Sequence, residues 1–78
     1  MKSLEEFVAL FAEQFEETDA SVFTAETSFR ELDEWSSLLA LSIIAMVDDE
    51  FDIQLKGDEM RSANTIQELY NLVALKVK

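Results

Sequence analysis

The sequence contains no cysteine, no histidine and no proline, and it has one glycine, Gly57. Without cysteine, neither a disulfide nor a thiolate metal site can hold the chain together. Without histidine, the chain lacks the commonest general base and the usual ligand of zinc. Because both helix-breaking residues are nearly missing, the composition favours helices. A length of 78 residues predicts one domain, spanning residues 1–78, with a modest core.

Basic residues are also scarce, since 6 of them face 17 acidic residues and leave a net charge of −11. Such a surface repels phosphate backbones and anionic lipids, so neither nucleic acid nor a membrane is an expected partner. It should attract proteins that carry basic patches. The longest apolar run is too short for a membrane span, and Glu5 and Glu6 stand where a secretory signal would be apolar. We therefore expect a cytoplasmic protein, and a monomer because no dimer seam is evident.

What the chain does contain is helical periodicity. Ser3 and Glu6 fit a capping box, in which each side chain bonds a backbone N–H of the other. Apolar residues then recur at steps of three and four, as one face of a helix requires: Leu4, Phe7, Val8, Phe11 and Phe15. The pattern predicts a first helix over residues 3–17.

Residues 18–36 show neither helical nor alternating periodicity. A loop of this length is uncommon in a compact domain unless its own side chains hold it down. We expect five apolar residues to pin it across the open side of the helices: Val22, Phe23, Phe29, Leu32 and Trp35. For Trp35 this packing role is preferred over a functional one.

The segment EWSSLLALSIIAMVDDEF, residues 34–51, predicts a second helix capped by Ser36 or Ser37. On a helical wheel, one half collects the side chains expected to be buried: Leu39, Ala40, Ile43, Ile44, Met46, Val47 and Phe51. Glu50 falls on the same half, which we attribute to fraying of the helix end. The outward half carries a small apolar patch beside Ser37, made of Leu38, Leu41 and Ala45 and bordered by Asp48 and Asp49. Clustered exposed apolar residues of this kind suggest a contact site.

A turn at residues 56–58 separates this helix from a short third one, expected over residues 59–62 with its start at Asp58. Thr65 and Glu68 match another capping box and open a last helix. The predicted fold is all-α, a small bundle of three main helices and one short helix, with a long loop between the first two.

Catalysis and metal binding find little support in these residues. A nucleophilic serine normally needs a base held by a third group, and no such motif surrounds Ser37. The acids of residues 48–52 lack the ligand order of a calcium-binding loop. A serine at a helix N-terminus has another use, because free N–H groups and the helix dipole favour a phosphate there. Its hydroxyl could carry a phosphodiester that another enzyme installs.

The motifs together resemble the acyl carrier proteins and their peptidyl and aminoacyl relatives. Ser37-Leu38 stands before DDEFDI, residues 48–53, at the spacing that this family uses. SFREL at residues 28–32 looks like the family's Ser-Phe-x-x-Leu, and TIQEL at residues 65–69 follows without a gap. The resemblance covers essentially the whole chain, and its specific part runs from Phe29 to Leu69.

This resemblance implies that Ser37 receives a 4′-phosphopantetheine arm from coenzyme A through a magnesium-dependent phosphopantetheinyl transferase. The thiol of the arm would carry acyl or aminoacyl groups as thioesters to loading, condensing and transfer enzymes that have basic patches. Partners in this family grip the second helix, which would place Leu38, Leu41, Ala45, Asp48 and Asp49 in the contact. The carrier itself would not be an enzyme.

Two departures from the family pattern concern the attachment site. Ser36 stands where the family usually has aspartate, and the loop before Ser37 is one residue longer and contains Trp35. Loss of the aspartate would weaken transferase recognition or mark a subfamily with its own partner enzyme. The loop with Trp35 favours a divergent or specialised pathway over housekeeping fatty-acid synthesis, so the expected role lies in a fatty-acid, polyketide, peptide or related specialised pathway. The alternative is a carrier-like interaction module that is no longer phosphopantetheinylated.

Overall fold

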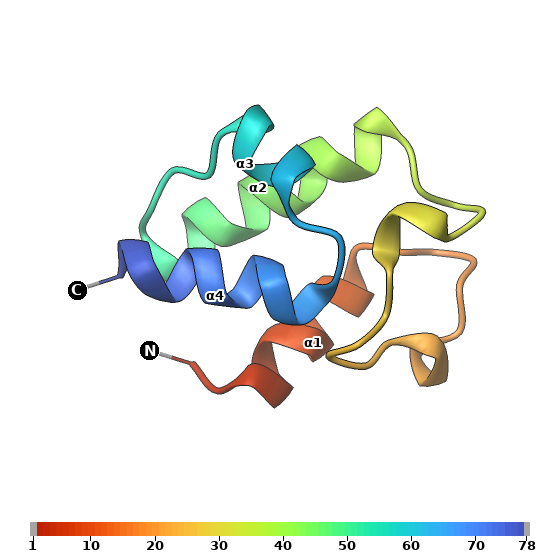
Figure 1. Ribbon diagram of the computed structural model, residues 1–78. Coiled ribbons are helices and arrows are strands. Elements are labelled where there is room, and N and C mark those ends of the chain that lie inside the picture. Colours follow the sequence, from red (N-terminus) through yellow and green to blue (C-terminus); the bar gives the residue numbers. More distant parts are fainter. Residues whose placement is uncertain (1, 78) are drawn as a thin grey trace.

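Four α-helices form the computed structural model, which describes residues 2–77 (Figure 1). They are α1 (Leu4–Glu13), α2 (Ser37–Phe51), α3 (Gly57–Ser62) and α4 (Ile66–Lys76). Two single-turn 3₁₀ helices, η1 (Ala20–Val22) and η2 (Phe29–Glu31), interrupt the long connection from α1 to α2. No β-strand occurs in this part of the chain, where the only pairing of strand type is an isolated bridge between Ser28 and Thr65. The predicted all-α architecture, with three longer helices and one short helix, is confirmed.

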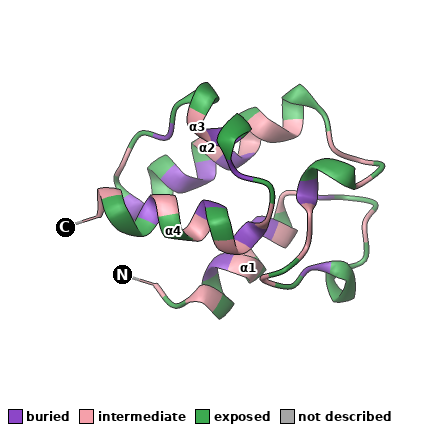
Figure 2. Cartoon of the chain, viewed as in Figure 1, coloured by how far each residue is buried: buried purple, intermediate pink, exposed green. Residues whose placement is uncertain are grey.

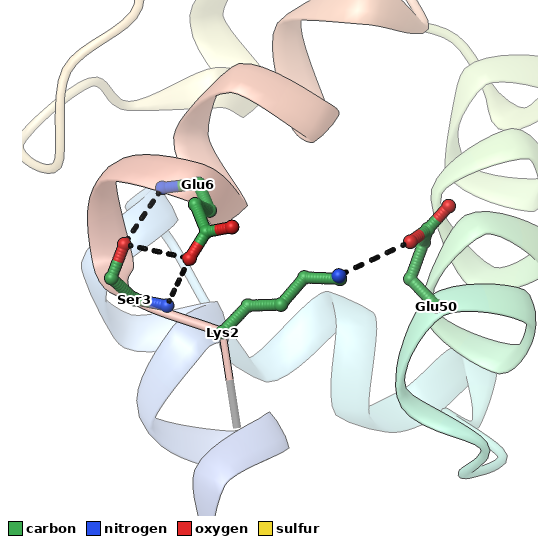
Figure 3. Close-up of polar contacts among 4 residues, drawn as sticks. All are labelled: Lys2, Ser3, Glu6 and Glu50. Atoms are coloured by element: carbon green, nitrogen blue, oxygen red, sulfur yellow. Dashed lines mark hydrogen bonds and ion pairs between the residues drawn. The ribbon is translucent and has the colours of Figure 1, made fainter.

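Side-chain caps fix where α1 and α4 begin. The Ser3 hydroxyl accepts a hydrogen bond from the Glu6 N–H, and the Glu6 carboxylate accepts one from the Ser3 N–H (Figure 3). Thr65 and Glu68 make the same reciprocal pair at α4. Both predicted capping boxes are therefore confirmed, and each satisfies two N–H groups that the helix leaves free.

The predicted end of α1 was wrong. The helix ends at Glu13, four residues before the expected position, and Phe15 packs into the core from the chain that follows it. The spacing of apolar residues predicted too long a helix, because Phe15 fits that spacing and is buried although it lies beyond the helix end. The third helix begins at Gly57, one residue before the expected start at Asp58.

Aromatic rings make up much of the core between the helices. Phe7, Phe11 and Phe29 are completely buried, and Phe11 lies 5.3 Å from Phe29 between ring centroids. Aliphatic side chains of α2 and α4 complete the interior: Ile43, Val47, Ile66, Leu69 and Val73. Figure 2 shows buried segments in α1, α2 and α4, in the interior that these helices surround. Burial of these faces supplies the main driving force for the fold.

The loop residues expected to pin the connection behave as predicted with one exception. Phe23 and Phe29 are buried, and Leu32 and Trp35 pack against the core. Val22 was predicted wrongly, because it lies in η1 with 46% of its surface exposed. A single 3₁₀ turn exposes some of its side chains, and sequence alone does not say which.

The two ends of the described chain lie on the same side of the molecule (Figure 1). Lys2 and Val77 line one hollow together with Phe51, the last residue of α2. The Tyr70 hydroxyl donates a 2.8 Å hydrogen bond to the Lys2 carbonyl, which joins the first residues to α4. The Lys2 ammonium lies 3.6 Å from the Glu50 carboxylate (Figure 3).

Candidate functional site

Two adjacent serines open α2, and the structure gives them different roles. Ser36 has extended backbone angles and is the N-cap, and its hydroxyl accepts a 3.4 Å hydrogen bond from the Leu39 N–H. Ser37 is the first residue of the helix and is exposed. Over residues 2–77, the hydroxyl of Ser37 makes no hydrogen bond. The choice of cap that the sequence left open is thus resolved in favour of Ser36, and the Ser37 hydroxyl is available to solvent.

Trp35 fixes the chain immediately before the two serines. Its indole stacks parallel to the Phe11 ring, with centroids 6.4 Å apart and planes 5° apart, and it packs at 4.9 Å against Phe29. Offset stacking and tilted contacts of this kind stabilise by about 0.5–1.5 kcal/mol per pair beyond the area they bury. The half-buried Trp35 therefore anchors the entry to α2 on the core.

Glu34 provides a polar anchor next to this aromatic one. Its carboxylate accepts hydrogen bonds from the N–H groups of Glu16, Glu17 and Thr18 and from the Thr18 hydroxyl. The Thr18 hydroxyl is the largest cause holding the pKa of this carboxyl below its ordinary value, and the three N–H groups add to it. The segment before Ser37 is thereby joined to the chain that follows α1.

The outward face of α2 carries the side chains expected to meet a partner. Leu38 and Leu41 are 72% and 63% exposed. Ala45, Asp48 and Asp49 are exposed as well. The opposite face is buried through Ile43, Met46, Val47 and Phe51. We call the five exposed residues the α2 face: Leu38, Leu41, Ala45, Asp48 and Asp49.

Glu50 does not mark a frayed helix end, as the sequence had suggested. Helix α2 continues through it to Phe51, and the exposed Glu50 carboxylate pairs with Lys2. The helical wheel placed Glu50 among the buried residues because it treats all residues on one half of a helix alike. In the last turn of α2, however, Phe51 is buried and Glu50 is exposed.

An apolar groove runs beside Ser37 between α2 and α3, with a volume of about 440 Å³. Ser36, Ser37, Ala40 and Ile44 line it from α2 and the residue before it, and Met60 lines it from α3. Arg30 and Arg61 also line it. Sequence reasoning missed these arginines, although a count of the basic residues near the serine along the chain would have singled out Arg30.

Neither a metal site nor a membrane span emerges from the described residues. They contain no group of three or more acidic side chains placed to hold a metal ion, and none of their helices is long and apolar enough to cross a membrane.

The surroundings of Ser37 suit a covalently attached phosphodiester. A free hydroxyl at the first position of a 15-residue helix lies at the positive end of the helix dipole, where N–H groups without helical partners stabilise an anion. The exposed position leaves room for a long substituent, and the groove beside it can contact one.

A family model described as "Phosphopantetheine attachment site" matches residues 5–73. No curated protein and no solved structure gives a significant match to the sequence. The matched range takes in all of α2 and α3 and most of α1 and α4.

Proposed function

We infer that Ser37 is the residue to which the prosthetic arm is attached, since the chain belongs to the phosphopantetheine attachment-site family. Members of this family are carriers and not enzymes, and they hold 4′-phosphopantetheine covalently. The observation that supports Ser37 is the division of roles at the start of α2. Ser36 caps the helix, whereas the Ser37 hydroxyl is exposed and makes no hydrogen bond to the rest of residues 2–77.

Attachment requires a phosphopantetheinyl transferase and coenzyme A. A bond forms between Ser37 Oγ and the phosphorus that bears the pantetheine, the pyrophosphate bond of coenzyme A breaks, and the adenosine-bearing phosphate leaves. The hydroxyl proton passes to a base of the transferase. The N-terminal end of α2 then stabilises the phosphodiester. Once attached, the arm supplies a thiol that holds an acyl or aminoacyl group as a thioester.

We further propose that the α2 face is where the transferase and the enzymes that load or use the thioester bind. Its exposed leucines supply apolar contact, and Asp48 and Asp49 attract basic patches on the partner. In this proposal the chain serves as a carrier in a fatty-acid, polyketide, peptide or related specialised pathway. The chain would act there as a cytoplasmic monomer with residues 1–78 as one domain.

Intact-mass measurement after incubation with coenzyme A, magnesium and a broad-specificity transferase tests the attachment site. We expect one phosphopantetheine on the wild type and none on Ser37→Ala. Ser36→Ala is the matched control, because it removes a hydroxyl one residue away and should still be loaded. Full loading of Ser37→Ala would refute the assignment.

The alternative, a carrier-like module that is not loaded, was suggested by Ser36 in place of aspartate. The N-cap hydrogen bond that the Leu39 N–H donates to the Ser36 hydroxyl speaks against it, because serine and aspartate cap helices about equally well and the start of α2 is capped without the aspartate. The mass of the protein purified from its native cells separates the two functions. A persistent unmodified mass there would favour the module.

A further inference from the structure

The only two arginines of the chain meet at the groove beside Ser37. Arg30 reaches from η2 to the end of α3, where its Nη1 donates to the Arg61 carbonyl at 2.6 Å and to Asn64 Oδ1 at 3.3 Å. The Arg61 side chain runs back along α3, and its Nη1 lies 3.7 Å from the position that a β-carbon on Gly57 would occupy. Hydrogen bonds thus hold the Arg30 guanidinium at the end of α3, whereas the Arg61 side chain lies along α3 near Gly57, and both residues are exposed and line the groove.

Among residues 2–77, neither guanidinium pairs with a carboxylate, although the chain has 17 acidic residues. In the part of the chain that the structure describes, the ion pairs are Lys2 with Glu50 at 3.6 Å and Lys76 with Glu59 at 2.9 Å. A guanidinium offers up to five N–H donors, and Arg30 uses one nitrogen to hold α3. The remaining donors of the pair are available to an anion in the groove.

The groove is longer than an anion at Ser37 alone requires. Its lining extends along α2 from Ser37 to Ile44, which is about 10 Å at the rise of an α-helix. Between these residues its walls are apolar, with Ala40 and Met60 facing it from α2 and α3. A phosphodiester on Ser37 already has the N-terminal end of α2 as its partner. The groove therefore suits an apolar chain that ends in a second anionic group.

We propose that the acyl group carried by this protein bears a free carboxylate, which lies in the α2–α3 groove and pairs with Arg61 and Arg30. The inference rests on attachment of the arm at Ser37. Methylene groups of such a cargo would contact the apolar walls, and its carboxylate would receive charge-assisted hydrogen bonds from the guanidinium groups. The arm consists largely of single bonds and amides, so its thiol end can fold back to the groove next to its own attachment point.

The test compares thioesters that differ in one charge. The apo protein is loaded by a broad-specificity transferase with succinyl-coenzyme A carrying a ¹³C-labelled carboxylate, and separately with butyryl-coenzyme A or coenzyme A. Intact mass confirms each product. The carboxylate pKa is then read from its ¹³C shift and compared with that of succinyl-pantetheine free in solution.

A pair with the arginines lowers this pKa, and we expect a decrease of about 0.5 unit or more relative to the free thioester. Without the pair, the net charge of −11 would raise the pKa of the cargo carboxylate instead, so the sign of the shift shows whether the carboxylate pairs with the arginines. Arg61→Gln should abolish the decrease, and Arg61→Lys should keep part of it. Lys56→Gln is the matched control, since it removes one positive charge next to α3 from a residue that does not line the groove.

Three results would overturn the proposal. One is a carboxylate pKa equal to or above that of succinyl-pantetheine. Another is an equal response of the Gly57 and Met60 amide signals to coenzyme A, butyryl and succinyl loading, which would assign the arginines to the phosphodiester. The last is an unmodified mass in every reaction, which would refute the attachment at Ser37 and the cargo together, whereas the first two leave attachment intact.

Discussion

The Glu34 carboxylate accepts a 2.7 Å hydrogen bond from the hydroxyl of Thr18, sixteen residues earlier in the chain. The same carboxylate accepts from the N–H groups of residues 16–18, so one side chain satisfies the backbone just beyond the end of α1. Glu34 precedes Trp35 and the two serines. The conformation of the loop and the position of Ser37 are therefore coupled through this carboxylate.

Glu34→Gln should lower the melting temperature at neutral pH, because an amide is a weaker acceptor for four donors. The hydrogen bonds lower the pKa of Glu34 in the folded state below its ordinary value of 4.5. Stability from this group is therefore present above the unfolded-state pKa and is lost as the pH falls through the folded-state value. Thermal unfolding followed by circular dichroism should show a wild-type advantage that shrinks below about pH 4.5.

Glu31→Gln, which removes an exposed carboxylate without such bonds, is the control. A pH-independent difference would contradict the linkage.

Ser36→Asp restores the residue that the family usually has before the attachment serine. Serine and aspartate are about equal as N-caps, so the gain comes from a negative charge at the positive end of α2, about 0.3–1 kcal/mol. We expect a higher melting temperature that falls back toward the wild-type value in salt. We also expect faster loading by the transferase, measured as kcat/KM. Ser36→Asn, which caps without the charge, should reproduce neither effect, and if it matched Ser36→Asp the charge would be irrelevant.

Leu38→Ala should weaken the transferase reaction without affecting the fold. Leu38 is 72% exposed, so its truncation should change the free energy of unfolding by less than about 0.5 kcal/mol. Because Leu38 is the residue of the α2 face that adjoins Ser37, its truncation should reduce kcat/KM for loading by about tenfold, or roughly 1.4 kcal/mol. Leu75→Ala is a matched control, because Leu75 is 70% exposed on α4. Equal effects of the two variants would argue against the α2 face.

Asp52 ends α2 in a left-handed conformation, with φ 57° and ψ 40°. Aspartate tolerates this conformation, but its charge at the C-terminal end of a helix opposes the dipole. Asparagine also tolerates the left-handed conformation and has no charge, so Asp52→Asn should stabilise the fold by about 0.3–1 kcal/mol. Alanine has no charge but disfavours the left-handed conformation, so Asp52→Ala should destabilise the fold by about 1 kcal/mol. Urea unfolding measures the two changes, and a stabilising Asp52→Ala would show that backbone strain is unimportant here.

Added sodium chloride should raise the melting temperature at neutral pH. The net charge of −11 repels itself across a small surface, and salt screens that repulsion. Divalent cations should act at lower concentration. Near the sequence pI of about 4.1, the same salt series should have little effect, which separates screening from general salting-out. A melting temperature that stays flat or falls at neutral pH would rule out significant self-repulsion.

The sequence predicted most of what local chemistry determines. The capping boxes at Ser3 and Thr65, the buried face of α2 and the exposed leucines follow from side chains a few positions apart. The end of α1 could not be predicted, because the N–H groups of residues 16–18 bond to Glu34, and that partner is distant in sequence. The choice between Ser36 and Ser37 as the cap depends on backbone angles that two adjacent serines allow equally. The groove and its arginines depend on how α3 packs against α2, which no local pattern specifies.

The hollow shared by Lys2, Phe51 and Val77 lies at the opposite end of α2 from Ser37, about 20 Å away along a 15-residue helix. A dye, an affinity tag or a surface linker joined at either end of residues 2–77 would therefore sit a full helix length from the Ser37 hydroxyl. The protein can therefore be immobilised through that side while Ser37 stays accessible to a transferase, an arrangement suited to single-molecule measurements of loading.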